Sequence, residues 1–165
     1  MIHYTSIDTP IGKILIAKTE KGICRIGLPS DDEESFTNWT VTQFPDENVI
    51  KNLKALDNEI NQLEKYFTGK LKKFSLPLDL QSSPFYKKVL MAVKNIPYGK
   101  TASYKQIAYR IDNPKAVRAV GNANANNPIP IIIPCHRVVA SNGSLGGYGG
   151  GLTMKRWLLE LEGAL

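Results

Sequence analysis

Cysteine and histidine are scarce in this chain of 165 residues, which contains two of each. Two cysteines cannot build a disulfide framework, and they fit a reducing compartment. A metal site needs three or four ligands, and Cys24, Cys135, His3 and His136 show neither CxxC nor HxxxH spacing. The sequence therefore predicts no disulfide-stapled fold, no bound metal ion and no cofactor.

Long hydrophobic runs are also missing. The longest unbroken apolar stretch, residues 129–134, is far shorter than the ~20 residues needed to cross a bilayer. The first fifteen residues lack the basic start and apolar core of a secretory signal. With 42% hydrophobic residues the chain can still build a packed core. Because it shows neither a membrane span nor a secretory signal, we expect a cytoplasmic protein that does not associate with membranes.

Acidic residues are scarce only in the second half of the chain. Residues 1–82 contain ten Lys or Arg and twelve Asp or Glu, a net charge of −2. Residues 83–165 contain eleven and three, a net charge of +8. A basic half suggests a polyanionic partner, but a solvated lysine-rich surface would have the same composition. Charge alone leaves both interpretations open.

The first third of the sequence predicts β-strands. Three short segments rich in β-branched residues are separated by turn residues: 2–7, 13–17 and 22–28. Residues 31–34 are interpreted as an acidic loop or helix start rather than a metal site. From Ile50 to Phe67 apolar residues recur every three or four positions, which predicts a helix ending near Gly69. These elements form a predicted domain over residues 1–75.

Residues 76–84 have the composition of a linker, and residues 85–165 form the second predicted domain. Its first helix is expected to begin at Ser83 and Pro84, an N-cap and first-turn pair, and to run to Ile96.

A helix-turn-helix is predicted within this second domain. Ser103 and Gln106 have the spacing of a capping box and open a short helix. The segment 112–114 (Asp-Asn-Pro) is expected to cap a further helix from Lys115 to about Asn124. Two short helices joined by a three-residue turn are typical of this motif.

The second of these helices has an unusually small surface. Ala116, Ala119, Gly121 and Ala123 leave Arg118 as its one long side chain, whereas base-reading helices carry several polar side chains. Small residues would allow close approach to the minor groove with one inserted arginine. They would serve tight helix packing equally well.

Cys135 is the candidate nucleophile. It follows the aliphatic run 129–133, which lies between two prolines and predicts a buried strand, and it precedes His136 and Arg137. Burial beside cationic groups suits a thiolate of lowered pKa, and sulfur is intrinsically a strong nucleophile. The alternative is a buried, inert cysteine, which is how we interpret Cys24.

Residues 133–139, Ile-Pro-Cys-His-Arg-Val-Val, resemble the active-site signature of the O6-alkylguanine-DNA alkyltransferases, also called methylated-DNA–protein-cysteine methyltransferases. The match covers nearly all of residues 83–165, whereas residues 8–12 resemble the family's amino-terminal hairpin more weakly. Further matching segments, in family order, are 97–99 with 103–104, 118–121, 127–128, 146–148 and 150–163. The resemblance implies an α/β protein with an amino-terminal ribonuclease-H-like sheet-and-helix domain and a mainly helical, winged-helix-like carboxy-terminal domain that contains the helix-turn-helix.

The implied activity is direct DNA repair. A family member binds duplex DNA through the minor groove without sequence specificity and flips out an O6-alkylguanine. It then transfers the alkyl group, mainly methyl, irreversibly to its own cysteine, so each molecule acts once. O4-alkylthymine is a further candidate substrate, and the protein is expected to be a monomer.

The resemblance also assigns roles in the reaction. Cys135 corresponds to the alkyl acceptor, and Glu162 and His136, with a bridging water, match the network that draws the thiol proton away. Tyr104 matches the phenol that protonates or hydrogen-bonds the departing guanine.

Further positions match the family's DNA-binding and pocket residues. Arg118 matches the arginine that fills the space left by the flipped base, and Asn127 the asparagine that links the recognition helix to the active-site turn. The other DNA-binding candidates are Ser103, Lys115, Ala119 and Gly121. The candidates for the base pocket are Pro130, Val138, Tyr148 and Gly149.

Two departures and three alternatives remain. Relatives often carry serine at Gly149, where glycine would keep a backbone contact but widen the pocket, and the zinc ligands of some relatives are missing. A related class of non-enzymatic proteins lacks the acceptor cysteine, which is present here. A helix-turn-helix regulator would prefer one DNA sequence, and a Cys-His hydrolase would turn over repeatedly.

Overall fold

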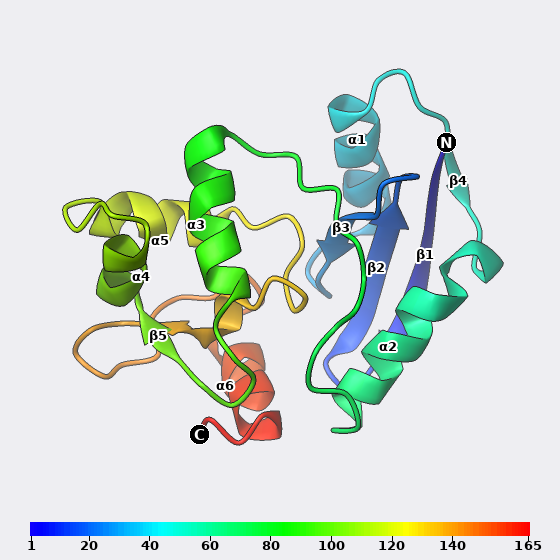
Figure 1. Ribbon diagram of the computed structural model, residues 1–165. Helices are drawn as coiled ribbons and strands as arrows, with labels where there is room; N and C mark the ends of the chain where they lie inside the picture. The colour runs from blue at the N-terminus through cyan, green and yellow to red at the C-terminus, as the bar shows by residue number, and fades with distance from the viewer. The chain divides into compact units, whose positions relative to one another are not determined.

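The computed structural model describes all of residues 1–165, which form two compact units, Met1–Gln81 and Ser82–Leu165 (Figure 1). The point of division lies within the segment 76–84. No helix in either unit is long and apolar enough to cross a membrane.

The amino-terminal unit is built on a four-stranded sheet with the strand order β3-β2-β1-β4. The three strands expected from the sequence are present: β1 (Ile2–Thr9), β2 (Gly12–Lys18) and β3 (Ile23–Gly27). They pair antiparallel, and Thr9 faces Gly12 across the first turn. Gly12 has a φ of 112°, a conformation that favours glycine, which explains the residue type at this turn.

The fourth strand corrects the sequence-based interpretation of the segment after Val49. Instead of starting a helix, β4 (Val49–Lys51) pairs parallel with β1 at the edge of the sheet. Leu53, which the periodicity placed on a buried stripe, is 59% exposed. The strand depends on pairing with residues almost fifty positions away, which a local repeat cannot reveal.

Two helices complete this unit. α1 (Glu33–Gln43) begins where an acidic loop or helix start was expected, because the Asp32 carboxylate accepts a hydrogen bond from the Ser35 N–H. α2 (Asp57–Phe67) follows a single 3₁₀ turn and buries Leu63 completely, as the apolar stripe predicted, and it also buries Tyr66, which lies outside that stripe.

The carboxy-terminal unit is mainly helical. Its helices are α3 (Pro84–Lys94), α4 (Tyr104–Arg110), α5 (Val117–Ala125) and α6 (Leu152–Leu161). Two short strands, β5 (Ala102–Ser103) and β6 (Val138–Val139), pair parallel and connect the start of α4 to the segment that follows Cys135. Figure 1 shows α4 and α5 beside α3.

Side-chain caps mark the start of α3 and α4 but not of α5, the second helix of the helix-turn-helix. The predicted N-cap at Ser83 and the capping box of Ser103 with Gln106 are both present. The cap predicted at residues 112–114 is wrong, because α5 begins after Ala116 with no side-chain cap. Asp112 instead has a φ of 57° and forms the turn between the two helices.

Residues 129–133 are buried, but the predicted strand is wrong. The chain folds back on itself, so that the Ile133 N–H donates to the Ile129 carbonyl at 3.0 Å. Ile131 has a φ of 74°, a strained conformation for a β-branched residue. Pro130 and Pro134 have no N–H to give to a strand ladder, which accounts for the turn.

Candidate active site around Cys135

Cys135 lies at the start of a 3₁₀ turn, Cys135–Arg137, and is 6% exposed. Pro134 has φ −80° and ψ 67°, and the Cys135 N–H donates to the Ile133 carbonyl at 2.8 Å. This geometry is an inverse γ-turn. The Cys135 carbonyl in turn accepts the Val138 N–H. The backbone of the candidate nucleophile is therefore fixed on both sides.

Burial raises the pKa of the Cys135 thiol to about 11. The Asn127 amide, the Lys155 charge and the backbone N–H groups of Cys135 and His136 lower the pKa, but burial outweighs them. The expectation of a thiolate of lowered pKa is therefore wrong for the resting protein. A proton acceptor has to take the thiol proton during any reaction.

His136 and Arg137 both contact the carboxylate of Glu162. His136 Nε2 lies 2.8 Å from Glu162 Oε2, while Arg137 Nε and Nη2 donate to Oε1 and Oε2 at 2.8 and 2.9 Å. Arg137 also donates from Nη1 to the Ile96 carbonyl at 2.7 Å. A guanidinium that donates two hydrogen bonds to a carboxylate favours its ionised form, so Glu162 accepts rather than donates hydrogen bonds in this cluster.

These contacts set the state of the imidazole. Burial lowers the pKa of His136 despite the opposing effect of Glu162, so the ring is neutral near pH 7. Because Nε2 faces an ionised carboxylate, we assign the single ring proton to Nε2. Nδ1 is then a buried acceptor with no hydrogen-bond partner.

Tyr104 is the first residue of α4 and is half-buried. A Cβ built on Gly146, whose φ is 73°, would lie only 3.1 Å from the Tyr104 Oη, so the loop passes directly over the phenol. Burial raises the pKa of Tyr104, while the backbone N–H of Gly147 lowers it and the Cys135 charge raises it further. The phenol therefore stays protonated at neutral pH and can donate.

Lys155 is a component of the site that the sequence interpretation missed. Its side chain on α6 is fully buried, and Nζ donates to the carbonyls of Val138 at 2.6 Å and Gly147 at 3.0 Å. Burial lowers the pKa of Lys155 to about 8, and the Cys135 charge opposes this shift. Its spacing from Leu158, Leu159 and Glu162 on one helical face was the signal that could have revealed it.

The expected pocket residues divide into a buried and an exposed group. Pro130 and Val138 are buried, and the Tyr148 ring stands edge-on to His136 with centroids 6.4 Å apart. Burial raises the pKa of Tyr148 well above its usual value, and its hydroxyl has no partner. Gly149 is exposed, and a Cβ there would meet nothing within 4 Å. A serine would therefore fit at this position.

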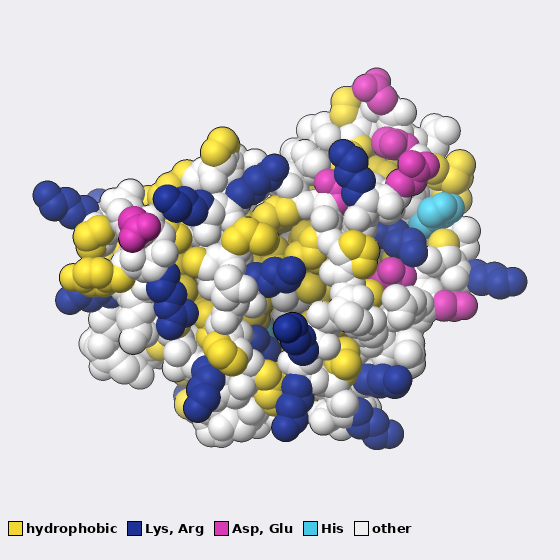
Figure 2. All heavy atoms as spheres, viewed as in Figure 1, with side chains coloured by type: hydrophobic (Ala, Val, Ile, Leu, Met, Phe, Trp, Pro, Cys, Tyr) yellow, Lys and Arg dark blue, Asp and Glu magenta, His cyan; other side chains and the backbone are white.

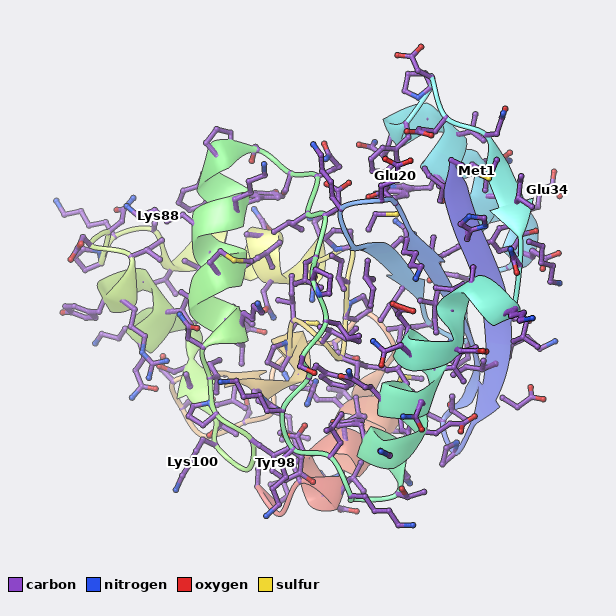
Figure 3. The ribbon with its side chains drawn as sticks, turned by 45° about the vertical axis from the view of Figure 1, so that its right-hand side comes forward. Met1, Glu20, Glu34, Lys88, Tyr98 and Lys100 are labelled. Atoms are coloured by element: carbon purple, nitrogen blue, oxygen red, sulfur yellow. The ribbon has the colours of Figure 1, made fainter.

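The candidate DNA-binding residues divide in the same way. Lys115, just before α5, and Arg118 on α5 are exposed, whereas Ala119 and Gly121 on α5 are half-buried. Figure 2 shows Lys and Arg side chains spread over the visible face of the carboxy-terminal unit. Lys88, labelled in Figure 3, extends outward from α3.

Two further candidates act on the protein itself. The Ser103 hydroxyl accepts the Gln106 N–H as a helix cap. Asn127 Nδ2 donates to the Ile133 carbonyl at 2.8 Å, and its Oδ1 accepts the Ile129 N–H at 2.9 Å. Asn127 therefore ties the end of α5 to the segment that leads into Cys135. Tyr98, also labelled in Figure 3, packs its ring 5.7 Å from the Arg137 guanidinium.

Comparison with known proteins divides the chain into the same two parts as its two compact units. Residues 2–80 match the ribonuclease-like domain of 6-O-methylguanine DNA methyltransferase, and residues 84–164 match the DNA-binding domain of the same protein. A methylated-DNA–protein-cysteine methyltransferase of Mycobacterium tuberculosis is 45% identical over 163 residues, which are 98% of this chain and 93% of the relative. This chain belongs to the 6-O-methylguanine DNA methyltransferase family. The constitutive enzyme of Bacillus subtilis is 43% identical, with 98% and 96% of the two chains covered.

Solved structures of methyltransferases share the fold. The crystal structure of Mycobacterium tuberculosis OGT in complex with DNA has a TM-score of 0.86 and 40% identity, covering 98% of this chain and 93% of that one. An O6-methylguanine DNA methyltransferase from Methanococcus jannaschii has a TM-score of 0.67 and 35% identity, covering 97% and 93%. The family and the two-part α/β fold predicted from the sequence are therefore confirmed.

Proposed function

We propose that this protein repairs duplex DNA directly, by moving the alkyl group of O6-alkylguanine, mainly methyl, irreversibly to the Sγ of its own Cys135. Relatives that are 42–45% identical are named methylated-DNA–protein-cysteine methyltransferases, and one solved relative is bound to DNA. The observation that carries the proposal is the buried thiol, which is followed directly by a neutral imidazole held by Glu162.

The proton of the thiol leaves toward His136. The free Nδ1 accepts it, directly or through a water molecule, and Glu162 stabilises the imidazolium that forms. Lys155 supplies a buried positive charge that favours the developing thiolate. Arg137 keeps Glu162 ionised and in place throughout.

The transfer itself is a displacement at carbon. A sulfur electron pair forms the S–C bond, the C–O6 bond breaks, and its electrons pass into the purine. Tyr104 donates a hydrogen bond or a proton to the ring as this negative charge develops. Guanine carries one more proton than its O6-alkyl form, which equals the proton that the thiol loses. If Tyr104 gives its proton to the base, its phenolate is reprotonated by the imidazolium of His136 through water. The products are a thioether on Cys135 and an undamaged base.

The target base must leave the stack, because a duplex shields its reactive carbon. Flipping costs a few kcal/mol, and Arg118, exposed on α5, takes the space of the extruded base from the minor groove side. The small residues Ala119 and Gly121 permit this close approach. The basic surface binds phosphates without sequence preference, with Lys115 among the contacts.

The remaining features follow from the chemistry. A thioether is not hydrolysed in neutral aqueous solution, so each molecule reacts once. O4-alkylthymine presents a similar carbon and is a further candidate substrate. The protein is proposed to act as a monomer. Two free, buried cysteines fit the reducing cytoplasm.

Incubation with duplex DNA that carries labelled O6-methylguanine tests the proposal. One methyl group per protein molecule is expected, and Cys135→Ala should lose transfer while it keeps DNA binding. Repeated turnover would indicate a hydrolase, and strong preference for one unmodified sequence would indicate a regulator.

A further inference from the structure

Asn124 connects α5, the helix that carries Arg118, to the candidate nucleophile Cys135. It lies on the buried face of α5 and is 6% exposed. Its Nδ2 donates to the Cys135 carbonyl at 3.3 Å, across eleven residues of sequence. Its Oδ1 is buried and has no hydrogen-bond partner. The family resemblance gave a role to Asn127 but none to this residue.

Asn124 on α5 and Asn127, just beyond the end of that helix, bond the carbonyls on either side of Pro134. Asn127 takes the Ile133 carbonyl at 2.8 Å, and Asn124 takes that of Cys135. Between these two points lies the inverse γ-turn that orients the thiol. The helix that carries Arg118 on its exposed side and the residue just beyond its C-cap thus each hold the turn that contains Cys135.

We propose that Asn124 is a positioning residue, which ties α5 to the backbone of Cys135 and so sets the direction in which the thiol attacks. This inference rests on the proposed alkyl transfer. A displacement at carbon requires alignment of sulfur, carbon and leaving oxygen, and a small misplacement of the nucleophile lowers the rate strongly.

The unpartnered oxygen of Asn124 is unfavourable for stability. A buried amide oxygen without a partner destabilises the folded protein, so a leucine of similar size should pack at least as well. The Cys135 carbonyl would keep the Val138 N–H, so the substitution creates no new unsatisfied group. An asparagine that is unfavourable for stability is expected where the function needs its N–H donor.

The test compares Asn124→Leu with Asn126→Leu. Asn126 lies at the end of the same helix, but it is exposed and its Nδ2 bonds only the Asn122 carbonyl. Three quantities are measured for each variant: the transfer rate at saturating protein, the dissociation constant for methylated duplex, and the thermal midpoint. Free O6-alkylguanine base serves as a second substrate.

Asn124→Leu should lower the saturated transfer rate about 10-fold or more on both duplex and free base. Its affinity for DNA and its thermal midpoint should stay at or above wild-type values, and Asn126→Leu should match wild type throughout. A wild-type rate in Asn124→Leu would overturn the inference, as would parallel losses of rate, affinity and stability. Absence of transfer by the wild-type protein would instead refute the proposed function.

Discussion

His136 Nε2 and Glu162 Oε2 lie 2.8 Å apart, and both side chains are completely buried. The imidazole is nevertheless neutral, because burial lowers its pKa more than the carboxylate raises it. Arg137 carries the positive charge that balances Glu162. The cluster therefore holds an imidazole that can accept a proton at Nδ1 without first losing one.

Glu162→Gln should damage both the fold and the reaction. The Arg137 guanidinium would remain buried without its carboxylate, and breaking such a pair costs about 3–5 kcal/mol of unfolding free energy. The amide would also stabilise the imidazolium poorly, so transfer should slow. Urea unfolding and single-turnover transfer measure the two effects, and unchanged stability would contradict the assigned pairing.

Lys155→Met should change the pH dependence of transfer. The pKa of Lys155 is about 8, so its support for the thiolate is present below that pH and is lost above it. The contribution of this charge to the transfer rate of the wild-type protein should therefore fall as pH rises through about 8. The variant should react more slowly near neutrality and lack that fall. Parallel pH profiles for the two proteins would argue against the electrostatic role.

The same lysine predicts a pH effect on stability. Burial lowers its pKa from 10.5 to about 8, so the folded protein binds fewer protons than the unfolded chain between these values. This group alone should make the unfolding free energy rise with pH across that window, and the destabilisation is fully present below pH 8. Cys135 titrates in both proteins and the Lys155 charge lowers its pKa, so the difference between wild type and Lys155→Met measures the lysine together with its interaction with the thiol. No difference in slope would contradict its burial as a cation.

Tyr104→Phe should slow transfer more than it weakens DNA binding. The phenol stays protonated at neutral pH and is held beneath Gly146, whereas phenylalanine keeps the ring but removes the donor. A rate loss of about 100-fold or more is expected if Tyr104 acts as the general acid. Equal losses of rate and affinity would instead indicate a binding role.

Arg118→Ala should harm repair of duplex DNA selectively. The side chain is exposed on α5 and has no part in the cluster around Cys135. Reaction with free alkylguanine base, which needs no flipping, should stay near the wild-type rate. Comparison of the two substrates measures the effect, and an equal defect on both would contradict a flipping role.

Local signals predicted part of this structure. The capping box at Ser103, the N-cap at Ser83 and the three amino-terminal strands depend on neighbouring residues, and all are present. Glu162 was linked to His136 only through the family resemblance, and the two side chains do lie together, with His136 Nε2 2.8 Å from Glu162 Oε2.

Features set by distant contacts escaped prediction. β4 requires pairing with β1, and the turn at Ile131 follows from prolines that a hydrophobic run conceals. Helical spacing could place Lys155 on the buried face of α6, but the carbonyls that Asn124 and Lys155 bond lie eight to seventeen residues away and follow from no local pattern. The thiol pKa was misjudged because the adjacent cationic side chain pairs with Glu162, leaving burial to dominate.

The most direct measurement is mass-spectrometric mapping of the protein after exposure to duplex DNA containing O6-methylguanine. We expect the peptide with Cys135 to gain the mass of one methyl group, while the peptide with Cys24, whose burial raises its thiol pKa to about 12, stays unmodified. Methyl loss from the DNA with an unmodified Cys135 would contradict the central claim.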